Sequence, residues 1–238
     1  MVTSRSEPGP TLVAVPGLGL RPTAWEPTLE ALGRPSRTVL LPGYGVRRRR
    51  GEEVAPAALG RALVDRLEAA DGPVVLLGHS AGAQVAAHAA ALAADRVVGL
   101  VLVGPSTDPR ARSWPALLGR WLRTAGHEPP RQLPVLAWSY ARTGPLHGVR
   151  TMEAARHDDL QRTLGGVRCP VLVLRGPHDR ICPADWAERL VAAAPAGSRT
   201  ETLPVGAHMV PLTHGPQVAA AVAAYLRPGG SGADVSGA

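Results

Sequence analysis

Short apolar runs alternate along the chain with longer segments of helical periodicity. Most of the runs are apolar at every position, which is typical of parallel strands covered on both faces. They predict six strands, at residues 11–15, 38–41, 74–77, 97–103, 171–174 and 200–203.

The segments between these runs carry the period of amphipathic helices. In residues 54–69, Leu59, Leu63 and Leu67 share one face of such a helix. Similar patterns predict helices at residues 23–32, 81–93, 184–194 and 216–226. Strand and helix alternate, so the fold class is α/β, with a mostly parallel sheet of about six strands and helices on both faces.

The alternation stops between the fourth and fifth predicted strands. Residues 106–168 are rich in Arg, Pro and Trp and show no strand pattern. Apolar residues from Trp114 to Leu122 recur there at helical spacing behind Ser113, a candidate N-cap. The sequence therefore predicts a core of residues 1–105 and 169–227, a helical insertion of residues 106–168 with further helices near 132–142 and 149–164, and a Gly/Ser-rich, disordered tail of residues 228–238.

The charge of the chain is strongly positive but gives little information about a partner. The formal net charge is +7, every basic residue apart from the histidines is Arg, and Lys, Asn and Phe are absent. The depleted residues share AT-rich codons, so a GC-rich genome accounts for the bias. The run of four arginines at residues 47–50 has no interleaved aromatic residues and is expected to be a solvated loop. We therefore predict no nucleic-acid partner.

Two further features concern the compartment. The most apolar long stretch, residues 74–94, is interrupted by polar residues, and the first ten residues lack the apolar region of a signal peptide, so neither membrane binding nor export is predicted. Cys169 and Cys182 match neither a disulfide framework nor a metal-binding pattern. Both are expected to be free thiols in a reducing cytoplasm.

One serine stands where a predicted strand becomes a predicted helix. Gly78-His79-Ser80-Ala81-Gly82 matches the G-x-S-x-G nucleophile elbow, in which glycines relieve crowding at a sharp turn. Ser80 would then lie above the carboxyl end of the sheet and at a helix N-terminus, which favours developing negative charge. These features predict that Ser80 is a nucleophile.

A nucleophilic serine needs a base and an acid that orients the base. In this arrangement the acid precedes the base along the chain. Asp179 follows the strand at residues 171–174, and His208 follows the strand at residues 200–203, so both are predicted to reach Ser80. The alternatives are Asp108, after the preceding strand, and His214. The remaining histidines are expected to be packing, structural or surface residues: His79, His88, His127, His147, His157 and His178.

An oxyanion hole would need two backbone N–H groups directed at one oxygen. The first is expected from Ala81, the residue after the nucleophile. The second is expected from Leu18, because Gly17 and Gly19 allow the backbone of that loop to approach closely.

The motifs together resemble those of the α/β-hydrolase superfamily. The resemblance covers about residues 10–227, in the order VPGLGL, LPGYG, GHSAG, RGPHDRICP and GAHMVPL. Pro16 replaces a His that is frequent in relatives, and Leu41 replaces the usual Asp, but neither change removes a catalytic group. The resemblance implies that residues 106–168 are a helical cap that shapes the substrate pocket.

The favoured function is a serine hydrolase acting on a small-molecule ester, lactone or thioester through an acyl-Ser80 intermediate, with no metal or organic cofactor. Serine at the elbow argues against the dehalogenase and epoxide-hydrolase relatives, which use Asp there. One alternative is a biosynthetic thioesterase, cyclase or eliminating enzyme on the same scaffold. A non-catalytic small-molecule binding protein is an alternative of another class.

The predicted cap leaves two questions open. It holds ten Arg against five acidic residues, and this excess would attract an anionic acyl carrier, although codon bias explains it equally well. Its aromatic residues would either line an apolar substrate pocket or pack in the core: Trp114, Trp121, Trp138 and Tyr140.

Overall fold

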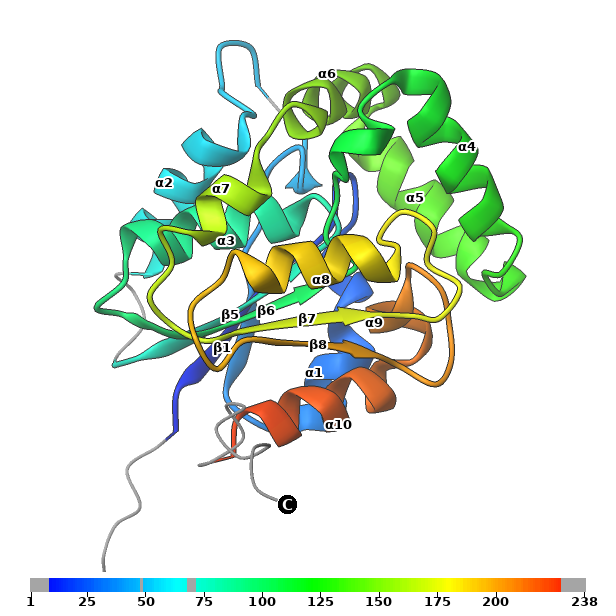
Figure 1. Cartoon of the computed structure of the whole chain (residues 1–238). Coiled ribbons are helices and arrows are strands. Elements are labelled where there is room, and N and C mark those ends of the chain that lie inside the picture. The colour runs from blue at the N-terminus through cyan, green and yellow to red at the C-terminus, as the bar shows by residue number, and fades with distance from the viewer. Residues whose placement is uncertain (1–8, 48, 68–71, 228–238) are drawn as a thin grey trace, which may run out of the picture.

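The structure is a computed structural model that describes residues 9–47, 49–67 and 72–227. Its main sheet has six parallel strands in the order β2-β1-β5-β6-β7-β8 (Figure 1). The strands are β1 (Thr11–Val15), β2 (Ser36–Thr38), β5 (Val74–His79), β6 (Val97–Val103), β7 (Val171–Arg175) and β8 (Arg199–Thr202), and a separate pair is formed by β3 (Leu41–Pro42) and β4 (Gly45–Val46). The predicted parallel sheet is confirmed, whereas the predicted disordered tail at residues 228–238 lies outside the described residues.

Helices cover both faces of the sheet, as predicted (Figure 1). One face packs against α2, α3, α7 and α8, and the other against α1 and α10. Trp186 of α8 and Trp25, just before α1, are the largest fully buried side chains on the two faces. The helices are α1 (Glu26–Leu32), α2 (Pro56–Leu67), α3 (Gly82–Leu92), α4 (Trp114–Ala125), α5 (Leu133–Thr143), α6 (Pro145–Arg156), α7 (Leu160–Leu164), α8 (Ala184–Ala192), α9 (Val210–Thr213) and α10 (Gly215–Tyr225).

The two edge strands differ from their predicted positions. The apolar residues 38–41 predict a strand, but β2 comprises Ser36–Thr38, and β8 begins one residue before the predicted Thr200. Each edge strand has only one strand neighbour and is partly exposed, so its sequence does not need to be apolar throughout. The four interior strands, in contrast, are apolar on both faces and begin where they are predicted to begin.

Helices α4 to α7 lie within residues 106–168, between β6 and β7, and α4 to α6 lie beyond the carboxyl ends of the strands (Figure 1). We call residues 106–168 the helical insertion. The side chain of Ser113 accepts a hydrogen bond from the amide of Ala116, as expected for the N-cap of α4. The single helix predicted at residues 149–164 is divided between two helices, because α6 ends at Arg156 and α7 begins after Asp159, whose side chain caps it.

A buried carboxylate connects this insertion to the core. Asp108 is fully buried, and its oxygens accept hydrogen bonds from Arg110, from Arg120 of α4 at 2.8 Å and from Arg189 of α8 at 3.3 Å. Burial raises the pKa of Asp108, but the hydrogen bonds from Arg110 and Arg120 outweigh it and lower the pKa to about 2. The ion-pair cluster therefore links α4 to α8 through the Asp108 carboxylate.

Two features concern membrane-spanning helices and disulfide bonds. In the described parts of the chain, none of the helices combines the length and the apolar character that a bilayer crossing requires. Cys169 and Cys182 are both buried and form no disulfide.

We expect Asp108→Asn to lower the free energy of unfolding by about 2 kcal/mol near neutral pH, because hydrogen bonds to charged groups each contribute about 1.5–3 kcal/mol. The depressed pKa means that Asp108 stabilises the fold above the unfolded carboxyl pKa of about 3.9, and that this contribution is lost as the pH falls through about 2. Urea unfolding at several pH values measures both effects.

Asp185→Asn is the matched control, since Asp185 also pairs with Arg110, at 2.6 Å, but its side chain is 52% exposed. An exposed pair contributes at most about 1 kcal/mol. Equal losses for the two variants would contradict a special role of the buried cluster.

Candidate active site

Ser80 lies at the turn from β5 into α3, with a backbone φ of 54°. A residue with a side chain adopts this left-handed conformation at an energetic cost, and such residues are enriched at functional sites. Glycine is required around it, since a Cβ on Gly82 would collide with the carbonyl oxygen of Pro16 and one on Gly78 would lie 2.6 Å from the Cα of Ala83. The predicted elbow is therefore present as a tightly packed turn.

The structure brings together the three polar residues that the sequence predicts. Nε2 of His208 and Oγ of Ser80 are 2.9 Å apart, and Nδ1 of His208 donates to Oδ2 of Asp179, also at 2.9 Å. Asp179 is fully buried, and its Oδ1 accepts hydrogen bonds from the amides of Ile181 and Cys182. The Asp179 carboxylate is thus held by the backbone and in turn orients the imidazole of His208.

The charges of the pair favour a protonated imidazole beside an ionised carboxylate. Burial lowers the pKa of His208, but the charge and hydrogen bond of Asp179, aided by Glu128, outweigh it and raise the pKa above its ordinary value. Burial raises the pKa of Asp179, but interactions with His208 outweigh it and leave the pKa lowered. His208 is therefore a stronger base than a free histidine.

The loop that carries Asp179 is held by Arg175, a buried residue at the end of β7. Its guanidinium donates to the carbonyl oxygen of Cys182 at 2.8 Å and to that of Asp179 at 3.1 Å. Sequence analysis did not identify this residue. A charged residue that ends an otherwise apolar strand just before the loop was the available signal.

His79 lies directly behind this site. Its ring is 1% exposed, packs edge-on against Trp25 and donates from Nε2 to the carbonyl oxygen of His208 at 3.0 Å. Burial and the neighbouring His208 lower the pKa of His79 to about 3, so this ring is neutral near neutral pH. It supports the His208 loop, consistent with the predicted packing role.

Two backbone amides near Ser80 have no acceptor. Within the described residues, neither the Leu18 nor the Ala81 amide donates a hydrogen bond. Gly17 packs against the elbow so closely that a Cβ there would lie 3.2 Å from the Cβ of Ser80. Leu18 follows Gly17 and Ala81 follows Ser80, and the role of their two amides as oxyanion donors stays a prediction.

A cavity of about 440 Å³ lies between the helical insertion and the core. Ser80 and His208 are among the residues that line it, and apolar side chains of α4 and α5 form much of its wall. Of the four aromatic residues singled out in the sequence, Trp114, Trp121 and Tyr140 line the cavity. Trp138 is not among the lining residues; it is 57% exposed, with the guanidinium of Arg142 over its ring.

The alternative acid and base make other contacts. Asp108 is surrounded by arginines, as described above, and does not line the cavity. Nδ1 of His214 is 2.9 Å from Oγ of Thr213, and His178 stacks on His127 of the insertion. The other predicted structural or surface histidines are His88, which is bonded to Asp158, His157, which is exposed beside Glu153, and His147, whose side chain lies outside the described residues.

A metal centre finds no support in the part of the chain that is described, where no group of three or more His, Cys, Asp or Glu residues could hold an ion. The chemistry that the arrangement can perform is proton transfer between Ser80 and His208 beside two free amide donors.

Comparisons with known proteins show what the chain is similar to. The sequence model of the protein family described as "Alpha/beta hydrolase family" matches residues 12–221 of this chain. A pimeloyl-[acyl-carrier protein] methyl ester esterase of Xylella fastidiosa is 28% identical over 250 residues, covering 92% of this chain and 95% of the relative. Polyketide synthase ThaQ of Burkholderia thailandensis is 29% identical over 92% of this chain, which corresponds to 12% of that protein. A solved structure of a hydrolase from Pseudomonas aeruginosa PA01 is 27% identical, with a TM-score of 0.71 and coverage of 94% and 92%.

We expect the two buried histidines to titrate far apart in an NMR experiment. His208 should titrate above the ordinary histidine pKa, whereas His79 should remain neutral through pH 5. Asp179→Asn should lower the pKa of His208, because it removes the negative charge that favours the imidazolium. An unchanged His208 pKa in this variant would contradict the assigned electrostatics.

Proposed function

Because the chain belongs to the alpha/beta hydrolase family, we propose that it is a serine hydrolase that cleaves a carboxylic ester, lactone or thioester. The observation that carries the proposal is the hydrogen-bonded chain from Ser80 through His208 to Asp179, with both distances at 2.9 Å. A binding protein without catalytic activity would not need these two hydrogen bonds between Ser80, His208 and Asp179 next to a cavity.

The hydrogen bonds at Ser80 and His208 support the following mechanism. Oγ of Ser80 attacks the acyl carbon while Nε2 of His208 takes the hydroxyl proton, and Asp179 stabilises the imidazolium that forms. The amides of Leu18 and Ala81 stabilise the oxyanion of the tetrahedral intermediate. His208 returns the proton to the leaving alcohol or thiol, which leaves an acyl-Ser80. Water, deprotonated by His208, then releases the acid and restores the serine.

The helical insertion acts in this proposal as the cap that selects the acyl group. Trp114, Trp121 and Tyr140 belong to an apolar wall around a cavity of about 440 Å³, which suits an uncharged acyl chain or ring. The pocket would thus set specificity, while Ser80 and His208 serve every acyl group alike.

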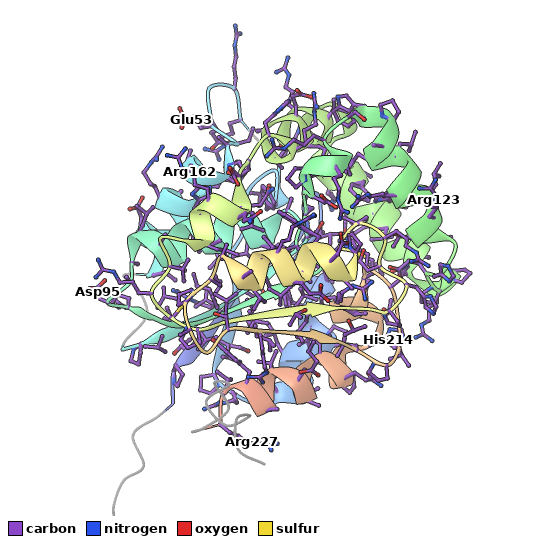
Figure 2. All side chains as sticks on the ribbon, viewed as in Figure 1. Glu53, Asp95, Arg123, Arg162, His214 and Arg227 are labelled. Atoms are coloured by element: carbon purple, nitrogen blue, oxygen red, sulfur yellow. The ribbon has the colours of Figure 1, made fainter. Side chains whose placement is uncertain are left out.

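A carrier-bound ester or thioester is the second candidate substrate, favoured by the acyl-carrier-protein esterase and the polyketide synthase among the relatives. The insertion offers positive charge for an anionic carrier. Arg123 projects outward from α4 (Figure 2), and neither Arg123 nor Arg150 forms an ion pair with a described acidic residue. The two buried free cysteines support a cytoplasmic location, where such carriers occur.

We expect a fluorophosphonate to label the protein at Ser80, because this hydroxyl lies beside a base and near two amides that have no acceptor within the described residues. Peptide mass spectrometry identifies the labelled residue, and hydrolysis of a p-nitrophenyl ester should be lost with labelling. Ser80→Ala should fold normally and take no label. Full labelling of that variant would refute the proposed nucleophile.

Recruitment of a carrier predicts a charge-dependent rate. The kcat/KM for a thioester on an acyl carrier protein should fall steeply with added salt, because attraction between exposed charges is screened over about 8–10 Å at physiological ionic strength. The double variant Arg123→Gln/Arg150→Gln should lower that value at low salt, whereas a neutral ester should respond to neither change. Equal salt sensitivity for both substrates would leave only the small-molecule esterase or lactonase.

A further inference from the structure

Three polar side chains of the helical insertion lie at four-residue spacing and contact the segments that follow three different strands of the sheet. Arg120 and Thr124 are on α4, and Glu128 follows its end, where the backbone keeps turning through hydrogen bonds from His127 to Thr124 and from Glu128 to Ala125. The spacing places Arg120 and Thr124 on one side of α4, and the turn after the helix brings Glu128 to the loop of His208. We call Arg120, Thr124 and Glu128 the docking stripe.

Each member of the docking stripe is paired with the loop after a different strand. Arg120 donates to Asp108, after β6. The Thr124 hydroxyl accepts from the amide of Arg180 at 3.0 Å, one residue after Asp179 and beyond β7. Glu128 contacts the loop that follows β8.

The contact of Glu128 is the closest to the chemistry. Its Oε1 accepts from the amide of His208 at 2.7 Å and from that of Met209 at 2.8 Å, and its Oε2 accepts from the side chain of Gln132 at 3.0 Å. One carboxylate oxygen thus binds two successive amides on the loop that carries the base. Charge-assisted hydrogen bonds of this kind are stronger than neutral ones.

We propose that Glu128 is a positioning residue for the reaction, which holds the backbone of His208 so that Nε2 stays within hydrogen-bonding distance of Ser80. This inference rests on the proposed serine-hydrolase function. It adds that a residue of the helical insertion, and not of the core, helps to hold His208 in position. Glu128 also lines the substrate cavity together with His208, so the same residue contacts the pocket and the backbone of the base.

The electrostatic surroundings agree with this role. The charged or titratable groups that act on His208 are Asp179 from the β7 loop, Glu128 from the insertion and the neutral His79 from β5. The negative charge of Glu128 contributes to raising the His208 pKa. Glu128 also adjoins a second cavity whose lining includes four basic or titratable side chains, from the insertion and from two core loops: His127, Arg131, His178 and His214.

Two substitutions separate the contact from the charge. Glu128→Ala removes both, and we expect it to lower kcat for a neutral ester by about 10²-fold with little change in KM, since a displacement near 1 Å of a reacting group costs about that factor. Glu128→Gln keeps an acceptor oxygen for the two amides and should retain most of kcat. Glu188→Gln, on the exposed face of α8, makes the same charge change as a control and should leave both constants unaltered.

The pH profile supplies a measurement that loss of structural support alone would not change. His208 must be neutral to accept the serine proton, so kcat/KM rises with pH through its pKa. Both Glu128 variants should lower this pKa and shift the acidic limb to lower pH, whereas Glu188→Gln should not. NMR titration of His208 measures the same shift without substrate, and the Gln variant carries the test if the Ala variant does not fold.

Three results would overturn the inference: unchanged kcat in a folded Glu128→Ala variant, an acidic limb that stays in place in both variants, or an equal loss of kcat in the Gln and Ala variants. Failure of the parent function has a different signature. In that case the unmodified protein would take no fluorophosphonate label at Ser80, although the His208 pKa would still fall on substitution of Glu128.

Discussion

The left-handed backbone of Ser80 determines where every other group of the site has to lie. With a φ of 54°, the residue reverses the chain direction between β5 and α3 and leaves its hydroxyl at the carboxyl edge of the sheet. The surrounding structure has to hold this unfavourable conformation in place. Gly82 lets the loop after β1 pack against the turn, and Gly17 of that loop lies close to the side chain of Ser80. The acid and the base can then come only from loops that leave the same edge of the sheet.

Those constraints explain how much of the fold and site the sequence predicts. Interior strands are buried on both faces, so their apolar runs locate them within a few residues, whereas β2 and β8 at the edges give a weaker signal. Ser80, Asp179 and His208 are predictable because each follows a strand whose end lies at one known edge. Because the strands are parallel, the loops that follow them meet at this edge, and there the three side chains form hydrogen bonds with one another.

Residues that act by tertiary docking leave no comparable trace in the sequence. Arg175 is one arginine among many in a chain whose basic residues apart from the histidines are all Arg, and only the structure shows it buried against the backbone of the Asp179 loop. Glu128 and Thr124 lie in the insertion, some 50 to 80 residues from the loops they contact. Helix α4 thus serves two roles: its apolar side chains line the cavity, while Arg120 and Thr124 bond to the segments after β6 and β7.

The docking stripe combines two kinds of recognition, with different consequences for how the sequence can change over evolution. Arg120 recognises a side chain, that of Asp108, so a change at either position alters the pairing unless the other changes with it. Thr124 and Glu128 instead bind backbone amides, which every residue except proline provides. Residues 180 and 209 are therefore free to vary without loss of these contacts. Related chains should accordingly show correlated substitution at positions 108 and 120, while exclusion of proline is the main restriction that the stripe imposes on the loops after β7 and β8.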